Sequence, residues 1–215
     1  MVTDHIFSQS LKTHTTVLPD GFVYLHDIDP TIQQDVRYYS GNNFIGRPIK
    51  GYQKATCILT KQAAIALSTV QKSLQQKHPE LTLLVYDCYR PQMAVEDFIA
   101  WSKDDTDHKM KAEYYPNVDK SELFSRGYVA AKSSHTRGST MDLTIKSLDM
   151  GTHFDFMDPR SHNDASDITL LQKKNRLLLK HLMEQHGFKP YRYEWWHYTL
   201  ANEPFPNTYF NFPVK

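Results

Sequence analysis

The feature that most constrains this chain is a set of potential metal ligands divided between two distant segments. His135 and Asp142 lie in residues 133–142, and His197 lies in residues 194–197. Two imidazoles and one carboxylate leave a tetrahedral Zn²⁺ with one position open for water, whose pKa the metal lowers to about 7. The fold must therefore bring these two segments together.

Glu194 is the candidate base that removes a proton from this water, because it lies three residues before His197. Residues three apart face opposite sides of a regular strand and share one face of a helix. If residues 192–200 form a strand, a bulge or bend near Trp195 and Trp196 is therefore required for both side chains to serve one metal site.

The composition is typical of a single enzyme-sized domain. The 215 residues contain no Pro/Gly/Ser-rich linker, repeat or low-complexity run. With 25 Lys+Arg against 24 Asp+Glu, nothing suggests a nucleic-acid partner or an anionic membrane surface. An aromatic share of 13% and 11 histidines suit a concave site for a small partner.

Targeting signals and cysteines leave the compartment open. No apolar run approaches the ~20 residues of a membrane span, and residues 1–18 lack the apolar core of a signal peptide. The polar residues 1–19 are interpreted as an N-terminal extension. If an export signal preceding it has been removed, the protein is periplasmic, and otherwise it is cytoplasmic. Cys57 and Cys88 either form a disulfide, which implies an oxidising compartment, or remain two unpaired buried thiols.

The first half of the sequence predicts a helix, a strand and a second helix. Thr60 can cap a helix to about Lys77 with an apolar face, and residues 81–86 read as a buried strand. Pro91 fits the first turn of the following helix. Residues 87–90 then form a strand-to-helix turn that presents Arg90, in a position where functional side chains are common.

The second half predicts two strands separated by a long helix. Residues 140–145 read as a strand that carries Asp142, after a loop that carries His135. A helix begins at Asp167 or Thr169 and ends at Gly187. Residues 192–200 form the last strand, and residues 105–127 form short helical pieces and loops. The stripe expected to cover the sheet is Leu170, Leu171, Leu177, Leu178, Leu182 and Met183.

Each of these residues also has an ordinary structural interpretation. A single His-x6-Asp match arises often by chance, Glu194 and His197 could form a polar pair at a sheet edge, and Arg90 could be a structural salt-bridge partner. Their joint context favours a site. Histidines without such a context are assigned to the surface or to helices; these are His153, His162, His181 and His186.

Several motifs closely resemble the D-alanyl-D-alanine dipeptidases of the vancomycin-resistance type, a family of zinc D,D-peptidases. The resemblance covers about residues 20–215, which we take as the zinc D,D-dipeptidase domain. It is carried by Tyr86-Asp87-Cys88-Tyr89-Arg90-Pro91, Ser134-His135-x-Arg137-Gly138-x-x-x-Asp142-Leu143-Thr144, Phe154-Asp155-Phe156-Met157-Asp158, Glu194-Trp195-Trp196-His197-Tyr198 and the C-terminal residues 206–215.

This resemblance implies a single α+β domain with a central, mainly antiparallel sheet flanked by helices, as in hedgehog-like domains and D,D-peptidases. It implies one Zn²⁺ per chain, held by His135, Asp142 and His197. Glu194 matches the family's catalytic base and Arg90 the arginine that stabilises the scissile carbonyl. Positions that contact the substrate in relatives correspond to Tyr38, Ser133 and Asp155, with Asp155 near the free ammonium.

The implied activity is hydrolysis of the dipeptide D-Ala-D-Ala to free D-alanine, in cell-wall peptide turnover or glycopeptide resistance. Departures from the family pattern include Cys88, where the resistance enzymes have Gly, a short segment between Lys146 and Phe154, and a longer N-terminus. A D,D- or L,D-carboxypeptidase acting on longer peptidoglycan peptides is the nearer alternative. A non-catalytic zinc-stabilised binding module is the more distant one, and Glu194 and Arg90 argue against it. Chirality preference and oligomeric state are not determined by the sequence.

Overall fold

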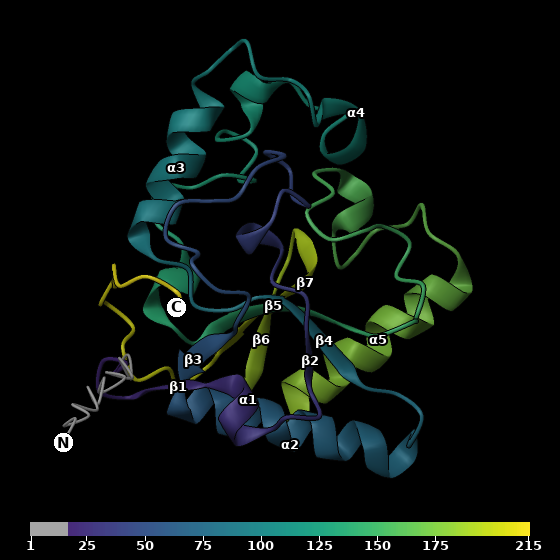
Figure 1. Ribbon diagram of the computed structural model, residues 1–215. Coiled ribbons are helices and arrows are strands. Elements are labelled where there is room, and N and C mark those ends of the chain that lie inside the picture. Colours follow the sequence, from purple (N-terminus) through teal and green to yellow (C-terminus); the bar gives the residue numbers. More distant parts are fainter. Residues whose placement is uncertain (1–16) are drawn as a thin grey trace, which may run out of the picture.

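The computed structural model describes residues 17–215, and its centre is a five-stranded sheet (Figure 1). The strand order is β2-β4-β5-β7-β6, and every pairing is antiparallel except the parallel pair β2 and β4. This arrangement confirms the expected α+β fold with a mainly antiparallel sheet. Most of the predicted N-terminal extension, residues 1–16, lies outside the described residues. The strands are β2 (Gln33–Gln34), β4 (Leu83–Asp87), β5 (Thr140–Ile145), β6 (Phe188–Tyr191) and β7 (Glu194–Leu200).

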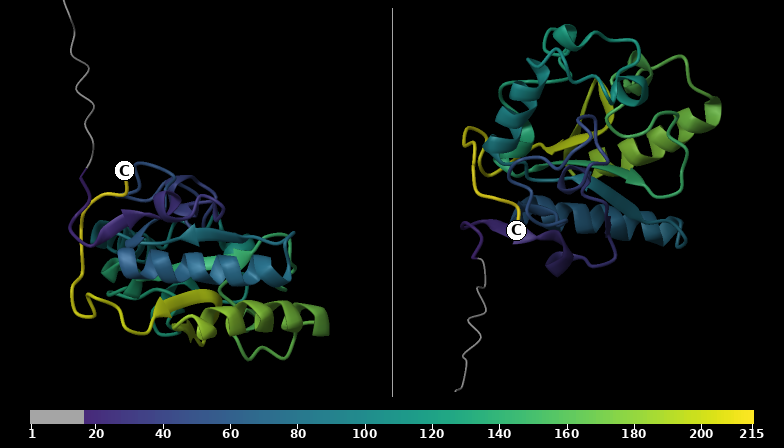
Figure 2. Two further views of the ribbon diagram at one scale, coloured as in Figure 1. Left: turned by 90° about the horizontal axis from the view of Figure 1, so that it is seen from below. Right: turned by 45° about the horizontal axis from the view of Figure 1, so that its top comes forward.

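A second, two-stranded sheet pairs β1 (Phe22–Tyr24) with β3 (Ile58–Thr60). A short helix α1 (Leu25–Ile28) follows β1, and the 3-10 helix η1 (Arg37–Tyr39) follows β2. The C-terminal segment runs beside this region, where the Tyr24 hydroxyl donates to the carbonyl of Lys215 (Figure 2). This small sheet was not predicted from the sequence.

Two long helices, α2 (Lys61–Lys77) and α5 (Leu170–Gln185), lie side by side below the sheet in Figure 1. The Thr60 side chain accepts from the Ala63 amide as the expected cap of α2, and the apolar face predicted for this helix is buried. Thr169 forms a capping box with Gln172 at the start of α5. Between residues 17 and 215, no helix combines the length and apolar character that a membrane span requires.

The predicted apolar stripe of α5 is wrong in part. Leu170, Leu171 and Leu177 are exposed, whereas Leu179 is buried together with the predicted Leu182 and Met183. The three consecutive leucines 177–179 leave the phase of the helix ambiguous in the sequence. The buried face also contains a charged residue, Arg176, which a search for apolar periodicity does not select.

Smaller helices and loops lie above the sheet in Figure 1. The α3 helix (Gln92–Ser102) starts directly after Pro91, close to the predicted position. Residues 105–127 contain α4 (Lys111–Tyr114) and the 3-10 helix η2 (Lys120–Glu122), which confirms the expected short helical pieces. Two further 3-10 helices are η3 (Ser134–Arg137), before β5, and η4 (Pro159–Ser161), in the loop between β5 and α5.

Two predicted strands begin later than expected, β4 at Leu83 and β7 at Glu194, and β6 was not predicted. Pro190 lies in β6, and proline is tolerated there because β6 is an edge strand of the sheet. Cys57 and Cys88 form a disulfide, with their Cα atoms 5.3 Å apart, which resolves the two alternatives left open by the sequence. This bond connects the chain just before β3 to the turn that follows β4.

Candidate active site

Strand register places the central acidic residues and one imidazole in a row across the sheet. Asp142 on β5 pairs with Asp87 on β4 and with His197 on β7. Residues directly opposite each other on antiparallel strands point to the same face of the sheet. The three side chains therefore meet on one face, although they come from distant parts of the sequence.

The expected irregularity in β7 is present. Pairing between β6 and β7 shifts after Pro190, so that Tyr191 lies opposite Glu194 while Pro190 lies opposite Tyr198. This irregularity confirms the predicted bulge or bend around Trp195 and Trp196. It allows Glu194 and His197 to share one face, with Glu194 Oε2 3.4 Å from His197 Nδ1.

His135 completes the cluster from the 3-10 helix η3, which leads into β5. Its Nε2 atom lies 3.2 Å from Asp142 Oδ2 and 3.2 Å from His197 Nδ1. A single ligand atom from each of these three residues lies within 4.8 Å of the other two. Gly138 ends η3 with φ 84°, and a Cβ atom there would collide with the ring of Phe22. Glycine is therefore required for this turn to pack against β1.

The outer nitrogens of both histidines contact other groups, which orients their rings. His135 Nδ1 lies 2.7 Å from the carbonyl oxygen of Cys88, and His197 Nε2 lies 3.2 Å from Ser134 Oγ. A proton on each outer nitrogen would leave His135 Nε2 and His197 Nδ1 with free lone pairs facing Asp142. Burial also lowers the pKa of His135, which favours the neutral imidazole that a metal requires.

Asp142 also has the properties of a metal ligand. Burial alone disfavours its charge, but His135 and His197 outweigh this effect and hold its pKa well below the ordinary value. Its Oδ1 atom is buried and lacks an aligned hydrogen-bond donor among residues 17–215, although His197 Nδ1 lies 3.1 Å away. Three inward-facing N and O donors, one of them an orphaned carboxylate oxygen, fit a zinc ion.

Arg90 enters the site from the turn after β4, as expected. Its guanidinium lies 2.9 Å from Asp87 Oδ2 and 3.5 Å from Asp142 Oδ2. Asp87 is fully buried and also accepts a hydrogen bond of 2.6 Å from Tyr52. No role for Asp87 was predicted from the sequence, although this residue lies in the predicted strand-to-helix turn at residues 87–90. Ser134, which contacts His197, was missed in the same way within a stretch already noted.

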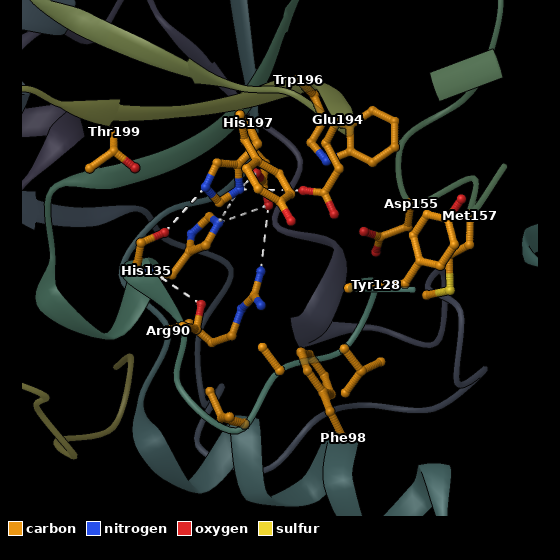
Figure 3. A pocket seen from close by; sticks show the side chains of 18 of the residues that line it. Arg90, Phe98, Tyr128, His135, Asp155, Met157, Glu194, Trp196, His197 and Thr199 are labelled. Carbon is orange, nitrogen blue, oxygen red and sulfur yellow. Dashed lines mark hydrogen bonds and ion pairs between the residues drawn. The ribbon is translucent and has the colours of Figure 1, made fainter. Parts of the chain in front are cut away.

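The cluster lines a cavity of about 460 Å³. Figure 3 shows Glu194 and Asp155 pointing toward each other across this cavity, with Arg90 on a third side. Burial raises the pKa of Glu194 to about 7. A carboxyl group with this pKa can both accept and release a proton near neutral pH.

Tyr38 and Asp155 lie together at the end of the cavity away from His135. The buried Tyr38 hydroxyl donates a hydrogen bond of 2.8 Å to Asp155 Oδ2, and the Arg90 guanidinium lies 5.0 Å from the centre of the Tyr38 ring. Asp155 forms no ion pair with any residue between 17 and 215. Burial and the nearby charge of Asp142 raise the pKa of Asp155 well above its ordinary value. A cation at this position would restore the charged carboxylate.

Ser133 also lines the cavity, and its Oγ accepts from the amide of His135 at 3.3 Å. All eight residues named from the sequence therefore line one cavity. His153 and His162 lie outside this cavity and its metal-ligand cluster, as expected. His181 and His186 belong to α5 and its C-terminal cap.

Similarity to known proteins identifies the family of this chain. The profile of the D-Ala-D-Ala dipeptidase family, peptidase M15, matches residues 19–215. The chain is 43% identical over 204 residues to the D-alanyl-D-alanine dipeptidase of Enterococcus faecalis, covering 92% of this chain and 100% of that protein. It is 42% identical over 199 residues to the D-alanyl-D-alanine dipeptidase of Streptomyces coelicolor, covering 90% of this chain and 98% of that protein.

Among solved structures, the LD-carboxypeptidase LdcB is 18% identical, with a TM-score of 0.46 over 88% of this chain and 72% of that chain. The sequence matches extend over nearly the whole chain and include every strand that contributes to the cavity. The chain therefore belongs to the D-Ala-D-Ala dipeptidase family of zinc-dependent peptidases.

Proposed function

We propose that this protein hydrolyses free D-Ala-D-Ala to D-alanine, using one Zn²⁺ bound by His135, Asp142 and His197. The activity is that of relatives 42–43% identical over most of the chain. The observation that carries the proposal is the position of Glu194 and Arg90 beside the same three donors. A purely structural metal site needs neither a mobile proton nor a cation directed at a reacting oxygen.

When bound, zinc would polarise the peptide carbonyl and lower the pKa of the attacking water. Glu194 accepts the proton of this water and then delivers it to the departing amine, as its pKa of about 7 allows. Both steps need a carboxylate next to the metal ligands that can accept a proton and release it again. Glu194 Oε2 lies 3.4 Å from His197 Nδ1, one of the proposed ligands.

Arg90 stabilises the negative charge that develops on the carbonyl oxygen. Asp87 holds the guanidinium from behind at 2.9 Å, so that the cation is oriented before the substrate arrives. By analogy with the loss of one oxyanion-hole donor, such a group contributes about 3–4 kcal/mol to transition-state stabilisation.

Asp155 and Tyr38 bind the ammonium group of the dipeptide. The supporting observation is a carboxylate in the cavity wall that accepts a hydrogen bond from Tyr38 and has no ion-pair partner between residues 17 and 215. Acylation of the substrate's amine removes the charge and adds bulk at this end. An unpaired buried polar group costs about 1–3 kcal/mol and a charged one costs more, so discrimination of at least about 10-fold against the acylated dipeptide is expected.

One assay tests the proposed function. Purified zinc-loaded protein is incubated with D-Ala-D-Ala, L-Ala-L-Ala and N-acetyl-D-Ala-D-Ala, and release of free amine is measured for each. We expect rapid hydrolysis of D-Ala-D-Ala and at least about 10-fold lower kcat/KM for the acylated substrate. Equal turnover of free and acylated substrates would move the protein to the carboxypeptidases. Hydrolysis of none of the three by zinc-loaded protein would favour a binding module.

A further inference from the structure

Arg176, in the middle of α5, is a buried cation without a carboxylate partner. Its side chain is 4% exposed, and no ion pair is found for it among residues 17–215. Its guanidinium donates to three main-chain carbonyl oxygens, those of Met150 at 2.6 Å, Arg160 at 2.8 Å and His162 at 3.0 Å. Burial lowers its pKa to about 10, so the group remains charged at neutral pH.

The three carbonyls lie on both sides of Asp155 in the loop that connects β5 to α5. Met150 precedes Asp155, and Arg160 and His162 follow it. Asp155 has φ 61°, in the left-handed region that non-glycine residues rarely adopt. Such a conformation costs about 1–3 kcal/mol and persists only where the surroundings enforce it. The hydrogen bonds of Arg176 are positioned to enforce it by joining the two arms of the loop.

A second set of contacts links this loop to the strand that carries Glu194. The Arg176 guanidinium carbon lies 5.7 Å from the centre of the Trp195 ring. The indole nitrogen of Trp195 donates to Thr152 Oγ1 at 2.8 Å, and Thr152 Oγ1 lies 3.0 Å from Ser161 Oγ. The loop around Asp155 is therefore attached to both α5 and β7, outside the cavity itself.

We propose that Arg176 is a positioning residue for the substrate's ammonium group, because it holds the Asp155 loop through three carbonyls. The inference rests on the proposed role of Asp155. Arg176 does not line the cavity and acts only through the loop. Removing the guanidinium leaves three carbonyls without their charged donor, and the Asp155 carboxylate then loses its fixed position opposite Glu194.

The kinetic test uses the full-length, zinc-loaded protein with Arg176→Met, which keeps an apolar stem and removes the charge. We expect KM for D-Ala-D-Ala to rise about 10-fold, while kcat changes less than about 3-fold. Lys180→Met on the same helix is the matched control, since Lys180 makes only a distant pair with Glu184, at 3.9 Å. An unchanged KM in folded Arg176→Met protein would overturn the proposal.

A double-mutant cycle separates positioning from general destabilisation. If Arg176 acts through Asp155, Arg176→Met should lower kcat/KM about 10-fold in the wild-type background and less than about 3-fold in Asp155→Asn. A loss of equal size in both backgrounds would show that Arg176 acts elsewhere. Zinc affinity, measured by competition with a chelator, should stay unchanged because the three proposed ligands are held by η3, β5 and β7.

A measurement without substrate distinguishes failure of this inference from failure of the proposed function. Amide hydrogen exchange of residues 150–162 should be faster in Arg176→Met, by about 10-fold or more, and unchanged in Lys180→Met. Unchanged exchange would refute the clamp, meaning the hold of Arg176 on the Asp155 loop through three carbonyls, even if Asp155 binds the ammonium. Faster exchange, together with an Asp155→Asn variant of normal KM, would retain the clamp but refute its link to the substrate. Should Arg176→Met fail to fold, Arg176→Lys is used, with smaller changes expected in the same directions.

Discussion

The two ends of the cavity are built in different ways. At the end that would hold zinc, Asp142 and His197 are paired residues of neighbouring strands, and Asp87 completes the same row. At the end that would hold the ammonium, Tyr38 comes from η1 and Asp155 from a loop. Strand register aligns Asp142, Asp87 and His197, and η3 adds His135, whereas the ammonium end depends on contacts made by the loops around it.

This contrast is visible in what supports each end. The loop after Tyr38 is fixed to α3 by Asp97, which accepts from Arg47 at 2.7 and 3.0 Å and from the Lys50 amide at 3.1 Å. The zinc end is supported by the ladder of the sheet and by the disulfide beside Arg90. The difference teaches that most residues of the proposed reaction are placed by the central sheet and the segments next to it, while those proposed to select the substrate are placed by loops that separate contacts hold. The two properties should respond to different substitutions.

The largest effect is expected at the zinc end. Glu194→Gln should reduce kcat for D-Ala-D-Ala by about 10³-fold while zinc content stays at one per chain, because Glu194 is the proposed base and not a ligand. Steady-state kinetics and metal analysis check this prediction, with Glu184→Gln on α5 as the control. Loss of zinc along with activity would place Glu194 among the ligands.

The next effect concerns stability of the same end. Replacing both cysteines, Cys57→Ser with Cys88→Ser, should lower the free energy of unfolding by about 4 kcal/mol, as chain entropy predicts for a cross-link that spans 31 residues. Urea unfolding at pH 7 measures it, and reduced wild-type protein should match the variant. KM should change little, since His135 contacts the main-chain carbonyl of Cys88 and not its sulfur. A variant as stable as the oxidised protein would contradict the prediction.

At the ammonium end, Asp155→Asn should lower kcat/KM for D-Ala-D-Ala by about 10–30-fold. It should change turnover of N-acetyl-D-Ala-D-Ala far less, and so narrow the gap between the two substrates. Zinc content should remain that of the wild type. The contrast between the two ends fails if Asp155→Asn loses zinc or lowers turnover of both substrates equally.

The smallest effect is a pH-dependent contribution to stability from Asp97, which fixes the loop after Tyr38. Burial alone would raise the pKa of Asp97, but the hydrogen bonds from Arg47 and Lys50 outweigh it, and the pKa lies below the ordinary value. A lowered pKa in the folded state stabilises the protein above the ordinary aspartate range, and this contribution is lost as the pH falls through the folded pKa.

Asp97→Asn should therefore cost about 1 kcal/mol at pH 7, and the difference from wild type should shrink below about pH 4. Urea unfolding across this range measures the effect. Asp164→Asn is the control, because Asp164 pairs with Arg192 on the surface, where both side chains are well exposed. A difference independent of pH would assign the cost of Asp97→Asn to packing.

Much of the zinc end could be predicted from the sequence because its signals are local. The alternation in residues 140–145 marks a strand, and the spacing of Glu194 and His197 already requires the irregularity that β7 contains. The proline after Arg90 marks the start of a helix, which locates the turn that holds this cation. Each inference needs only neighbouring residues and the geometry of a strand or a helix.

The ammonium end could be predicted only through family resemblance. The left-handed conformation of Asp155 cannot be read from the sequence, since aspartate adopts this region more often than most residues but occurs mainly in other conformations. Arg176 looks like an ordinary polar residue of an amphipathic helix, and only the fold reveals its three carbonyl partners. The apolar stripe of α5 was predicted only in part because the run of leucines at 177–179 fits more than one helix face.

Because the proposed zinc ligands come from distant parts of the chain, the stability of the protein should depend on zinc. His135 and His197 are 62 residues apart in the chain, so a metal bound to both would act as a reversible cross-link that exists only in the folded protein. Each tenfold rise in free zinc above the dissociation constant then adds about 1.4 kcal/mol to stability. The temperature at which this protein unfolds should therefore rise with the concentration of free zinc.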